Sequence, residues 1–403
     1  MGCEVRIGHD WNSFLQWPVT PEHELAQSKL IYLSPPQTID SCMASNSFGR
    51  IFRITTAGES HGPGLGVIID GCPAGLEIDE AYIQRELDRR RPGQSAITTQ
   101  RKESDRISIR SGVYDGKTTG APILILIPNE DQRSSDYDQV SKAYRPSHAD
   151  YTYEKKYGIR DHRGGGRSSA RETVNWVAAG AVAKLYLKKQ GMTIRGGVTS
   201  IGPINLDLAV ENMDWEAAEN NLVRCPDETT AALMQQWIEK ARDEGDTVGG
   251  IVTCVIDGIP AGLGEPVFHK LEADLAHAML SINASKGFEI GSGFAGTRMK
   301  GSEHNDEWTT AEKGLTTSTN RSGGIQGGIS NGMPVYFRVG FKPVSTLMKD
   351  QKSVNASGEA IILQGKGRHD PCVVPRAVAI VEAMAALVLV DHWLMQNAYT
   401  QSS

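Results

Sequence analysis

Three short turns in the sequence each combine a histidine with glycine or proline, and their side chains have the chemistry needed to move protons. They are Gly58–Gly62 (GESHG), Arg145–Asp150 (RPSHAD) and Gly367–Cys372 (GRHDPC). An imidazole or a carboxylate on a rigid turn can give a proton to a reacting group or take one from it. The recurrence of the pattern predicts acid–base chemistry, with purely structural histidines as the alternative.

The same residues argue against two other kinds of site. Ser60 and His61 are adjacent but lack the G-x-S-x-G elbow of a hydrolase, and neighbouring side chains do not by themselves pair as nucleophile and base. The histidines of the three turns form no H-x-H or H-x-x-x-H pair, so the sequence predicts no metal centre. The six cysteines form no C-x-x-C pair, and scattered thiols indicate a reducing, cytoplasmic compartment.

The stretch Arg160–Thr173 (RDHRGGGRSSARET) has the composition of an anion-binding turn. It holds three glycines, four arginines and two serines directly before an amphipathic helical pattern. A helix N-terminus offers unpaired N–H groups and a favourable dipole to an anion, and Arg167 and Ser168 add further donors. Ser169 and Glu172 have the spacing of a capping box. A well-capped glycine turn is the alternative, but it would not need the arginines, and no P-loop motif is present.

Further basic and glycine-rich segments predict a small ligand with several negative charges. Arg89–Arg91 ends a predicted helix, where such a run is by itself usually solvated, and Thr317–Gly332 (TSTNRSGGIQGGISNG) offers a second backbone cradle. The 43 glycines exceed the roughly 28 expected at about 7% usage. A net charge of −6 argues against nucleic-acid binding, which needs a broad basic face. The positive charge is therefore local.

The elements that must position these turns are a mixture of strands and helices. Strands are predicted at Ile51–Thr55, Arg106–Val113, Ala121–Ile127 and Val335–Phe341, with Ala121–Ile127 fully buried. Helices are predicted after the cap Asp79, at Ser169–Gln190 and at Arg376–Leu394, the last of them central because it is apolar around most of its circumference. Strands and helices do not alternate strictly, so the predicted fold class is α+β rather than a Rossmann sheet.

An internal repeat predicts a pseudo-symmetric domain. Val67–Leu76 (VIIDGCPAGL) resembles Val255–Leu263 (VIDGIPAGL), and each copy precedes a helical pattern. Two ordinary strand–turn–helix units that share a Pro-Ala-Gly turn are the alternative. We interpret residues 43–403 as one duplicated catalytic domain and residues 1–42, which lack transit-peptide features, as a poorly structured extension. The most apolar run, Ala383–Val390, is too short to span a bilayer, so no membrane association is predicted.

Together these stretches resemble the chorismate synthase family from Ser47 into the 390s. The matching segments, in family order, are Gly58–Gly62, Arg89–Gly93, Arg145–Tyr153, Gly164–Thr173, Ser281–Gly291, Asn320–Gly332, Lys342–Thr346 and Gly367–Cys372. The resemblance implies a β-α-β sandwich, with helices between and around antiparallel sheets, and a homotetramer. It implies conversion of 5-enolpyruvylshikimate 3-phosphate, a phosphorylated dicarboxylate, to chorismate and phosphate by an anti-1,4-elimination, the last step of the shikimate pathway. Reduced FMN is the implied cofactor and NADPH the candidate reductant; a flavin- or NADPH-dependent oxidoreductase is the alternative.

The same resemblance assigns roles to individual residues. His61 is similar to the acid that protonates the departing phosphate, His148 to the histidine that manages protonation of the reduced flavin, and Asp370 to the carboxylate that helps take the C6 proton. Ser60 and Arg90 resemble substrate-binding positions. The residues that resemble FMN-binding positions are Arg167, Ser168, Ser169, Asn283, Ala284, Gly327, Lys342, Pro343, Val344, Ser345, Thr346 and Arg368. Ala96 stands where many relatives have a basic residue. One potential contact to an anion, such as a nicotinamide cofactor or the substrate, is therefore missing at this position.

Overall fold

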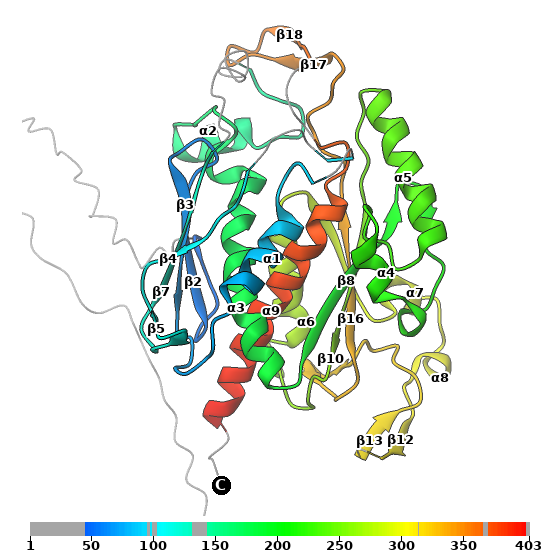
Figure 1. Cartoon of the computed structure of the whole chain (residues 1–403). Helices are drawn as coiled ribbons and strands as arrows, with labels where there is room; N and C mark the ends of the chain where they lie inside the picture. Colours follow the sequence, from blue (N-terminus) through cyan, green and yellow to red (C-terminus); the bar gives the residue numbers. More distant parts are fainter. Residues whose placement is uncertain are drawn as a thin grey trace, which may run out of the picture. The chain divides into compact units, whose positions relative to one another are not determined.

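Two antiparallel sheets face each other across a layer of helices (Figure 1). The computed structural model describes residues 45–94, 97–98, 103–130, 143–312, 314–365 and 370–399. The predicted extension 1–42, Ala96 and Arg368 lie outside these described residues. The mixture of helices and antiparallel sheets confirms the α+β class that the sequence predicts.

The first sheet contains the strands that lead into the His61 turn. Its order is β1 (Ser47–Phe48), β2 (Arg53–Gly58), β3 (Gly64–Asp70), β7 (Ile123–Pro128) and β4 (Ser108–Ile109), and every pair is antiparallel. Ile123, Ile125 and Ile127 of β7 are buried, whereas Leu126 is 39% exposed. The prediction of a fully buried strand is therefore wrong, because the helix layer packs on one face and the apolar run alternates between that face and the other.

The second sheet lies on the opposite side of the helix layer. Its order is β11 (Ser285–Ile290), β16 (Val335–Phe341), β10 (Gly250–Asp257), β8 (Thr193–Ile201) and β9 (Ile204–Asn205), again antiparallel. β16 has the predicted bounds, and its alternate residues Val335, Phe337, Val339 and Phe341 are buried. Alternation of this kind is typical of a sheet with one face against a core.

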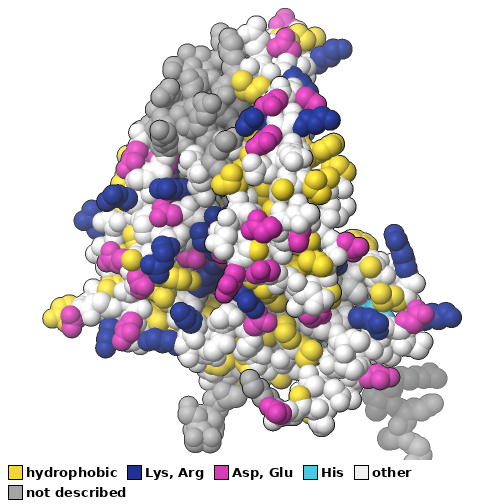
Figure 2. All heavy atoms as spheres, turned by 45° about the vertical axis from the view of Figure 1, so that its right-hand side comes forward, with side chains coloured by type: hydrophobic (Ala, Val, Ile, Leu, Met, Phe, Trp, Pro, Cys, Tyr) yellow, Lys and Arg dark blue, Asp and Glu magenta, His cyan; other side chains and the backbone are white. Residues whose placement is uncertain are grey.

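Short hairpins and further helices complete the described structure. The hairpins pair β5 (Val113–Tyr114) with β6 (Lys117–Thr118), β12 (Trp308–Ala311) with β13 (Gly314–Thr317), β14 (Ile325–Gln326) with β15 (Ile329–Ser330), and β17 (Gln351–Val354) with β18 (Ala360–Leu363). The further helices are α2 (Asp150–Tyr157), α4 (Trp215–Asn220), α5 (Glu228–Asp243), α7 (Gly293–Gly296) and α8 (Gly301–His304). The predicted strand Arg106–Val113 is thus divided between β4 and β5. On the face shown in Figure 2, acidic and basic side chains are interspersed.

Four helices form the layer between the sheets: α1 (Glu80–Arg90), α3 (Thr173–Lys189), α6 (Leu271–Leu280) and α9 (Val374–Tyr399). α1 begins as predicted, because the Asp79 carboxylate accepts a hydrogen bond from Tyr82 N at 2.8 Å. α3 and α9 approach closely at Gly180, where an added Cβ would lie 2.5 Å from the Ala383 Cβ. α9 has the length and hydropathy of a membrane-spanning helix, yet 83% of its most apolar window is buried inside the protein, as in a core helix.

The glycine-rich stretch does not lead directly into α3. Two short 3-10 turns within residues 166–172 come first, and α3 begins at Thr173 instead of Ser169. The Ser169 hydroxyl caps the second turn, while the Glu172 carboxylate bonds the Arg167 guanidinium. The predicted capping box is therefore wrong as a reciprocal pair, since the arginine holds the Glu172 side chain away from the Ser169 backbone.

The two copies of the Pro-Ala-Gly-Leu turn are held by matching hydrogen bonds. In the first copy, the Thr118 hydroxyl donates to Pro73 O at 2.7 Å and accepts from Leu76 N at 2.9 Å. In the second, the Ser330 hydroxyl donates to Pro260 O at 2.6 Å and accepts from the leucine N of that turn at 2.9 Å. Each hydroxyl belongs to a short hairpin strand, β6 or β15, and each turn connects a central strand, β3 or β10, to a helix of the layer.

Candidate active site

The turn between β2 and β3 carries Ser60 and His61 and is clamped by Asn129. The Asn129 amide donates to two carbonyls of the turn, at 2.9 and 2.8 Å. Ser60 donates to Gly164 O at 3.3 Å, and His61 is 8% exposed. The side chains of both predicted residues are therefore buried and lie beside the glycine-rich stretch.

Two consecutive glycines lie between His61 and His148. A Cβ added to Gly164 would lie 2.6 Å from His61 Nε2 and 2.7 Å from Ser60 Oγ, so no side chain fits there. A Cβ added to Gly165 would lie 3.2 Å from His148 Cε1. Both glycines have positive φ, +65° and +84°, which glycine adopts without steric cost. The structure thus brings together two predicted histidines that are far apart in the sequence.

His148 is oriented by an arginine and an aspartate of its own turn. Its Nδ1 lies 3.0 Å from Arg145 Nη2 and 3.2 Å from Asp150 Oδ1, and these two residues are themselves paired at 2.7 Å. Ser147 has φ +57°, an uncommon backbone for a non-glycine residue. Burial would raise the pKa of Asp150, but hydrogen bonds from Arg145 and His148 outweigh it and hold that pKa well below its usual range. Asp150 is therefore ionised and fixes the ring.

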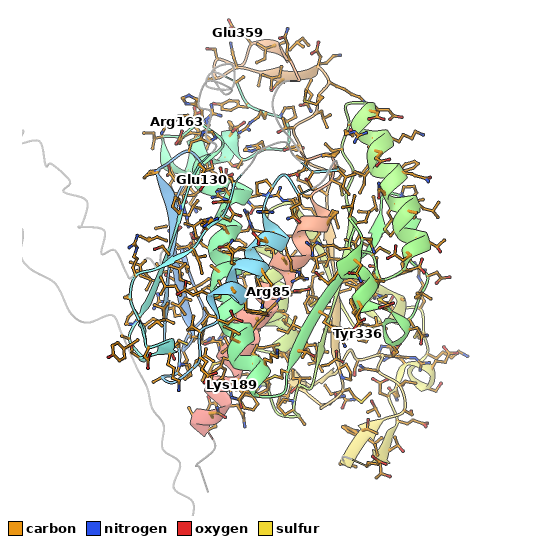
Figure 3. The ribbon with its side chains drawn as sticks, in the orientation of Figure 1. Arg85, Glu130, Arg163, Lys189, Tyr336 and Glu359 are labelled. Carbon is orange, nitrogen blue, oxygen red and sulfur yellow. The ribbon has the colours of Figure 1, made fainter. Side chains whose placement is uncertain are left out.

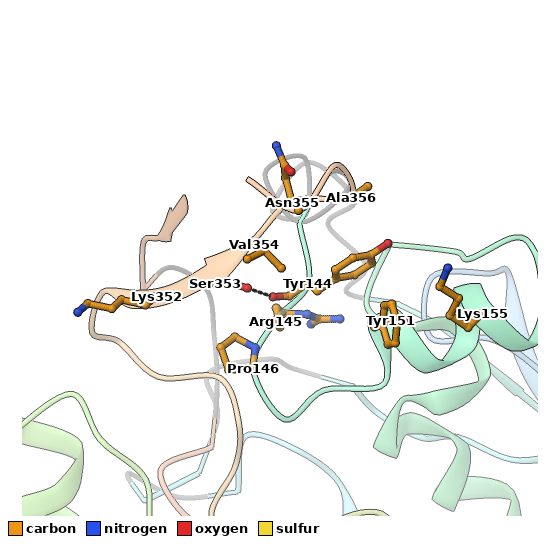
Figure 4. A pocket seen from close by; sticks show the side chains of 11 residues that line it. Tyr144, Arg145, Pro146, Tyr151, Lys155, Lys352, Ser353, Val354, Asn355 and Ala356 are labelled. Atoms are coloured by element: carbon orange, nitrogen blue, oxygen red, sulfur yellow. Dashed lines mark hydrogen bonds between the residues drawn. The ribbon is translucent and has the colours of Figure 1, made fainter. Parts of the chain in front are cut away.

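The β17–β18 hairpin supports the His148 turn. Tyr144 N donates to Val354 O at 3.3 Å, and the Ser353 hydroxyl donates to the Tyr144 carbonyl (Figure 4). A cavity of about 540 Å³ opens beside this contact, and its lining includes Arg145 and two lysines. The hairpin therefore connects the His148 turn to the part of the chain that leads to Asp370.

Ser168, Asn283 and Ala284 form a backbone cradle. Asn283 Nδ2 donates to Ser168 O at 3.0 Å, and Lys342 N donates to Ala284 O at 3.0 Å. Asn283 Oδ1 is buried with no hydrogen-bond partner among the described residues, and Ala284 has φ +67°. An open buried acceptor fits a ligand that brings an N–H donor, as the flavin ring of FMN does. Burial and the nearby Lys286 lower the pKa of Lys342, and a phosphate would relieve the repulsion between the two cations.

The arginines of the glycine-rich stretch all bond carboxylates of the chain. The pairs are Arg160 with Asp150 (3.2 Å), Arg163 with Asp161 (3.0 Å), Arg167 with Glu172, and Arg171 with Asp105. Arg167 also donates to Thr56 Oγ1 at 2.8 Å and to Gly58 O at 3.1 Å, both on β2. Figure 3 labels Arg163 at the upper left of the molecule, which locates the glycine-rich loop in that view. These described bonds hold the loop in place, and anion binding by these arginines stays a prediction.

Arg90 is buried and lies in a cluster of cations. Its Nη2 donates to Asp105 Oδ2 at 2.5 Å, and Arg171 bonds the other oxygen of that carboxylate. Arg90 Nε is buried without a partner among the described residues. Burial lowers the pKa of Arg90 to about 10, with Asp105 opposing the shift and the cations Arg171 and Arg376 adding to it. A buried open donor among three guanidinium groups fits an anion.

Asp370 joins this cluster through Arg376. The Arg376 Nη1 donates to Asp370 Oδ2 at 2.5 Å, and its Nε donates to Arg90 O at 3.0 Å. From Arg90 the bonds continue, through the shared Asp105 carboxylate and the next arginine, to the asparagine that clamps the His61 turn. A continuous network of hydrogen bonds therefore connects the predicted base with the turn of the predicted acid.

The other predicted cofactor positions make different described contacts or lie outside the described residues. Gly327 has φ +65° in the β14–β15 turn, and this hairpin bonds Pro260 and Leu271. No described hydrogen bond joins Gly327 to Ser168. In the segment Pro343–Thr346, Pro343 O accepts a hydrogen bond from Lys342 Nζ at 3.3 Å, and Val344 O accepts one from the Thr247 hydroxyl at 2.8 Å. Arg368 is not among the described residues.

Sequence reasoning assigned no role to four residues that hold the site: Asp105, Asn129, Asp150 and Arg376. Asp150 follows His148 by two positions in RPSHAD, which is a local signal for an orienting carboxylate. Asp105 and Asn129 form hydrogen bonds with residues that are distant in the sequence. Arg376 lies in a helix that is predicted only from its apolar pattern. Among the described residues, no group of three or more His, Cys, Asp or Glu side chains is arranged to hold a metal ion.

Comparison with known proteins shows what this chain is similar to. A family model described as chorismate synthase matches residues 52–394. The chorismate synthase of Cytophaga hutchinsonii is 59% identical over 355 residues, which cover 88% of this chain and 99% of the relative. The chorismate synthase of Synechococcus elongatus is 60% identical over 355 residues, covering 88% and 98%. A crystal structure of a chorismate synthase aligns with a TM-score of 0.70 at 34% identity and covers 86% of this chain and 93% of that chain.

The fold and the comparisons together define an enzyme that acts on a small molecule. The chain belongs to the chorismate synthase family, as its motifs predict. It is therefore a carbon–oxygen lyase that carries out the last step of the shikimate pathway.

Proposed function

We propose that the chain converts 5-enolpyruvylshikimate 3-phosphate to chorismate and phosphate with reduced FMN as its cofactor. The observation that carries this proposal is the network from Asp370 through Arg90 to the His61 turn. It connects a base, an anion site and an acid in one region. The substrate carries two carboxylates and a phosphate, and the three clustered guanidinium groups have the complementary charge.

In this proposal His61 assists the departure of phosphate from C3. Protonating a leaving group lowers the barrier to its departure, typically by about 10²- to 10⁴-fold in rate. The imidazole is buried against Gly164, with the Ser60 hydroxyl beside it, so its position is fixed before substrate binds. Arg90, whose Nε is open, binds an anionic group of the substrate.

Asp370 takes the proton that leaves C6. This hydrogen is not acidic, and a carboxylate alone would not remove it readily. Reduced FMN, when bound, supplies electron density transiently and regains it, so there is no net redox change. Asp370 is ready to accept the proton because its carboxylate is held in one orientation by Arg376.

The cofactor itself is assigned to the cradle of Ser168, Asn283 and Ala284, with Lys342 available to its phosphate. The open Asn283 Oδ1 supports this assignment. His148, whose ring approaches Gly165, is proposed to manage protonation of the reduced flavin. Arg167, Ser169, Gly327, Arg368 and residues 343–346 remain predictions from the family resemblance.

An anaerobic assay tests the proposed function. The purified chain is mixed with substrate and either reduced or oxidised FMN, and chorismate and phosphate are both measured. We expect the two products in equal amounts with reduced FMN and no turnover with oxidised FMN. Equal turnover with the two forms of FMN, or no turnover with either form, contradicts the proposal.

Replacing Gly164 by alanine is expected to lower kcat by about 100-fold. The new methyl group would collide with His61 and displace its imidazole. A misplacement of a catalytic group by about 1 Å can lower the rate by about that factor. Gly158→Ala is the matched control. Its φ of +71° is close to the +65° of Gly164, but its added Cβ would have nothing within 4 Å. Both variants should lose about 1–2 kcal/mol of stability from backbone strain. Equal kcat values for the two variants would show that the His61 contact is unimportant.

We also propose that residues 43–403 form a single domain that arose by internal duplication. The matching bonds of the two Pro-Ala-Gly-Leu turns support this. The strand orders support it too: β3 lies between β2 and β7 as β10 lies between β8 and β16, and β4 and β11 are corresponding edges. A long central helix follows each set, α3 in the first and α9 in the second.

The working form is proposed to be a cytoplasmic homotetramer, with NADPH as the candidate reductant of its flavin. Phe294 on α7, and Trp308 and Leu315 on the β12–β13 hairpin, are more than half exposed, which supports their burial against another copy. The cysteines within the described residues are buried and unpaired, as is typical of a reducing compartment: Cys72, Cys225, Cys254 and Cys372. The mixed charges in Figure 2 support a small-molecule partner over nucleic acid. Sedimentation equilibrium measures the oligomeric state.

A further inference from the structure

Arg376 occupies a position that the proposed chemistry does not yet explain. It is the third residue of α9, and its side chain is 15% exposed. Its guanidinium makes two hydrogen bonds in different directions, one to the Asp370 carboxylate at 2.5 Å and one to the Arg90 carbonyl at 3.0 Å. One planar group therefore touches both the candidate base and the backbone of the candidate anion-binding residue.

The Arg90 carbonyl oxygen needs a hydrogen-bond donor from outside its own helix. Arg90 is the last residue of α1, and the final carbonyls of a helix have no partner within the helix. Arg376 Nε satisfies this carbonyl from a helix that begins 284 residues later (374 against 90). The bond fixes the end of α1 against the start of α9 at the point where the buried Arg90 side chain enters the cation cluster.

The Asp370 side of the contact is held firmly as well. The next residue, Pro371, accepts a hydrogen bond from Val248 N at 2.9 Å, and Cys372 is fully buried. The segment between Asp370 and α9 is thus anchored to the chain just before β10. With the backbone after Asp370 anchored in this way, the bond from Arg376 bears directly on the orientation of the Asp370 carboxylate.

We propose that Arg376 is a positioning residue that sets the spacing between Asp370 and Arg90, and hence between the base and the substrate's anionic group. This inference rests on the proposed function. A guanidinium has donors in a rigid fork, so its Nε and Nη1 hold two partners at one fixed separation. A lysine at this position would keep the charge but present a single nitrogen, and it could not reproduce both bonds.

A double-mutant cycle tests this role. Arg376→Met, Arg376→Lys, Asp370→Asn and the double variant Asp370→Asn/Arg376→Met are assayed for phosphate release with reduced FMN. A hydrogen bond between charged groups corresponds to roughly 10- to 100-fold, so Arg376→Met should lower kcat by about that factor. Arg376→Lys should recover little of it. In the Asp370→Asn background, loss of Arg376 should change kcat by less than about threefold, because the orientation of the base no longer matters.

Two readouts separate positioning from a general structural role. Affinity for oxidised FMN, measured by flavin fluorescence, should be the same in all variants, since the described bonds of Arg376 involve Asp370 and Arg90 and not the Ser168–Asn283 cradle. Arg195→Met is the matched control, because Arg195 also bonds an aspartate, Asp257, at 2.6 Å, outside the proposed site. It should leave kcat unchanged.

The possible outcomes distinguish this role from the proposed function. Equal losses of kcat on removing Arg376 from the wild type and from Asp370→Asn would overturn the positioning role alone. Full recovery by Arg376→Lys would do the same, because charge without the fork would then suffice. If Arg376→Met does not fold, the lysine variant and its combination with Asp370→Asn complete the cycle. If the wild type itself releases no phosphate, the proposed function fails and this role fails with it.

Discussion

Asp370→Asn is expected to lower kcat by about 10²- to 10⁴-fold, the range that general acid–base groups contribute. The amide has nearly the same shape as the carboxylate and can still accept the hydrogen bond from Arg376, but it cannot take a proton. FMN affinity should stay close to that of the wild type, because the described contacts of the cradle involve Ser168, Asn283 and Ala284 and not Asp370. Steady-state phosphate release and a flavin titration measure the two quantities.

Asp257→Asn is the matched control for this variant. Asp257 also bonds an arginine, Arg195, at 2.6 Å, and it lies at the end of β10 outside the proposed site. Its kcat should be unchanged. If Asp370→Asn instead weakened FMN binding and left turnover nearly intact, Asp370 would have a structural part and the assignment of the base would be wrong.

Asp105→Asn is expected to cost about 3–5 kcal/mol of folding stability near pH 7. Asp105 is fully buried and bonds both Arg90 and Arg171, so the substitution leaves two buried cations without their shared counter-ion. Asparagine tolerates the φ of +49° found at this position, so backbone strain does not confuse the result. Urea unfolding of both proteins at pH 7 measures the loss.

The pH dependence of this effect follows from the Asp105 pKa. Burial raises it, but Arg90 and Arg171 outweigh burial and lower the pKa to about 2, below the value of about 3.9 in an unfolded chain. Stability from this group is therefore complete above about pH 4 and is lost as the pH falls toward 2. The difference between wild type and Asp105→Asn should shrink over that window.

An exposed acidic residue provides the comparison. Asp88 pairs with Arg91 at 3.5 Å, and both side chains are more than 40% exposed, so Asp88→Asn should cost less than about 1 kcal/mol. A similar small loss for Asp105→Asn, or a difference that does not change with pH, would contradict the view that its carboxylate is the centre of the buried cluster.

Elements with local signals could be predicted from the sequence. The cap Asp79 marks the start of α1, the alternation in Val335–Phe341 defines β16, and the apolar circumference of residues 376–394 predicts the central helix α9. Each of these signals arises from residues within one element. The glycine and histidine turns were likewise visible, because each combines its special residues within about six positions.

Features that depend on distant partners could not be predicted in this way. The apolar run Ala121–Ile127 predicts a strand that is buried on both faces. The helix layer covers only one face of this strand, so Leu126 on the other face is partly exposed. The capping box fails because Arg167 competes for Glu172. Asp105 and Arg376 belong to no local sequence pattern. Each is part of the site because it forms a hydrogen bond with Arg90, and only the fold brings these residues together.

The central claim is that the chain uses reduced FMN without consuming it. The most direct measurement is to follow phosphate release and the flavin absorbance together under anaerobic conditions, with substrate in large excess over reduced FMN. The account predicts many phosphates released per flavin, with the flavin still reduced at the end. One flavin oxidised for each phosphate released would contradict it and would favour an oxidoreductase.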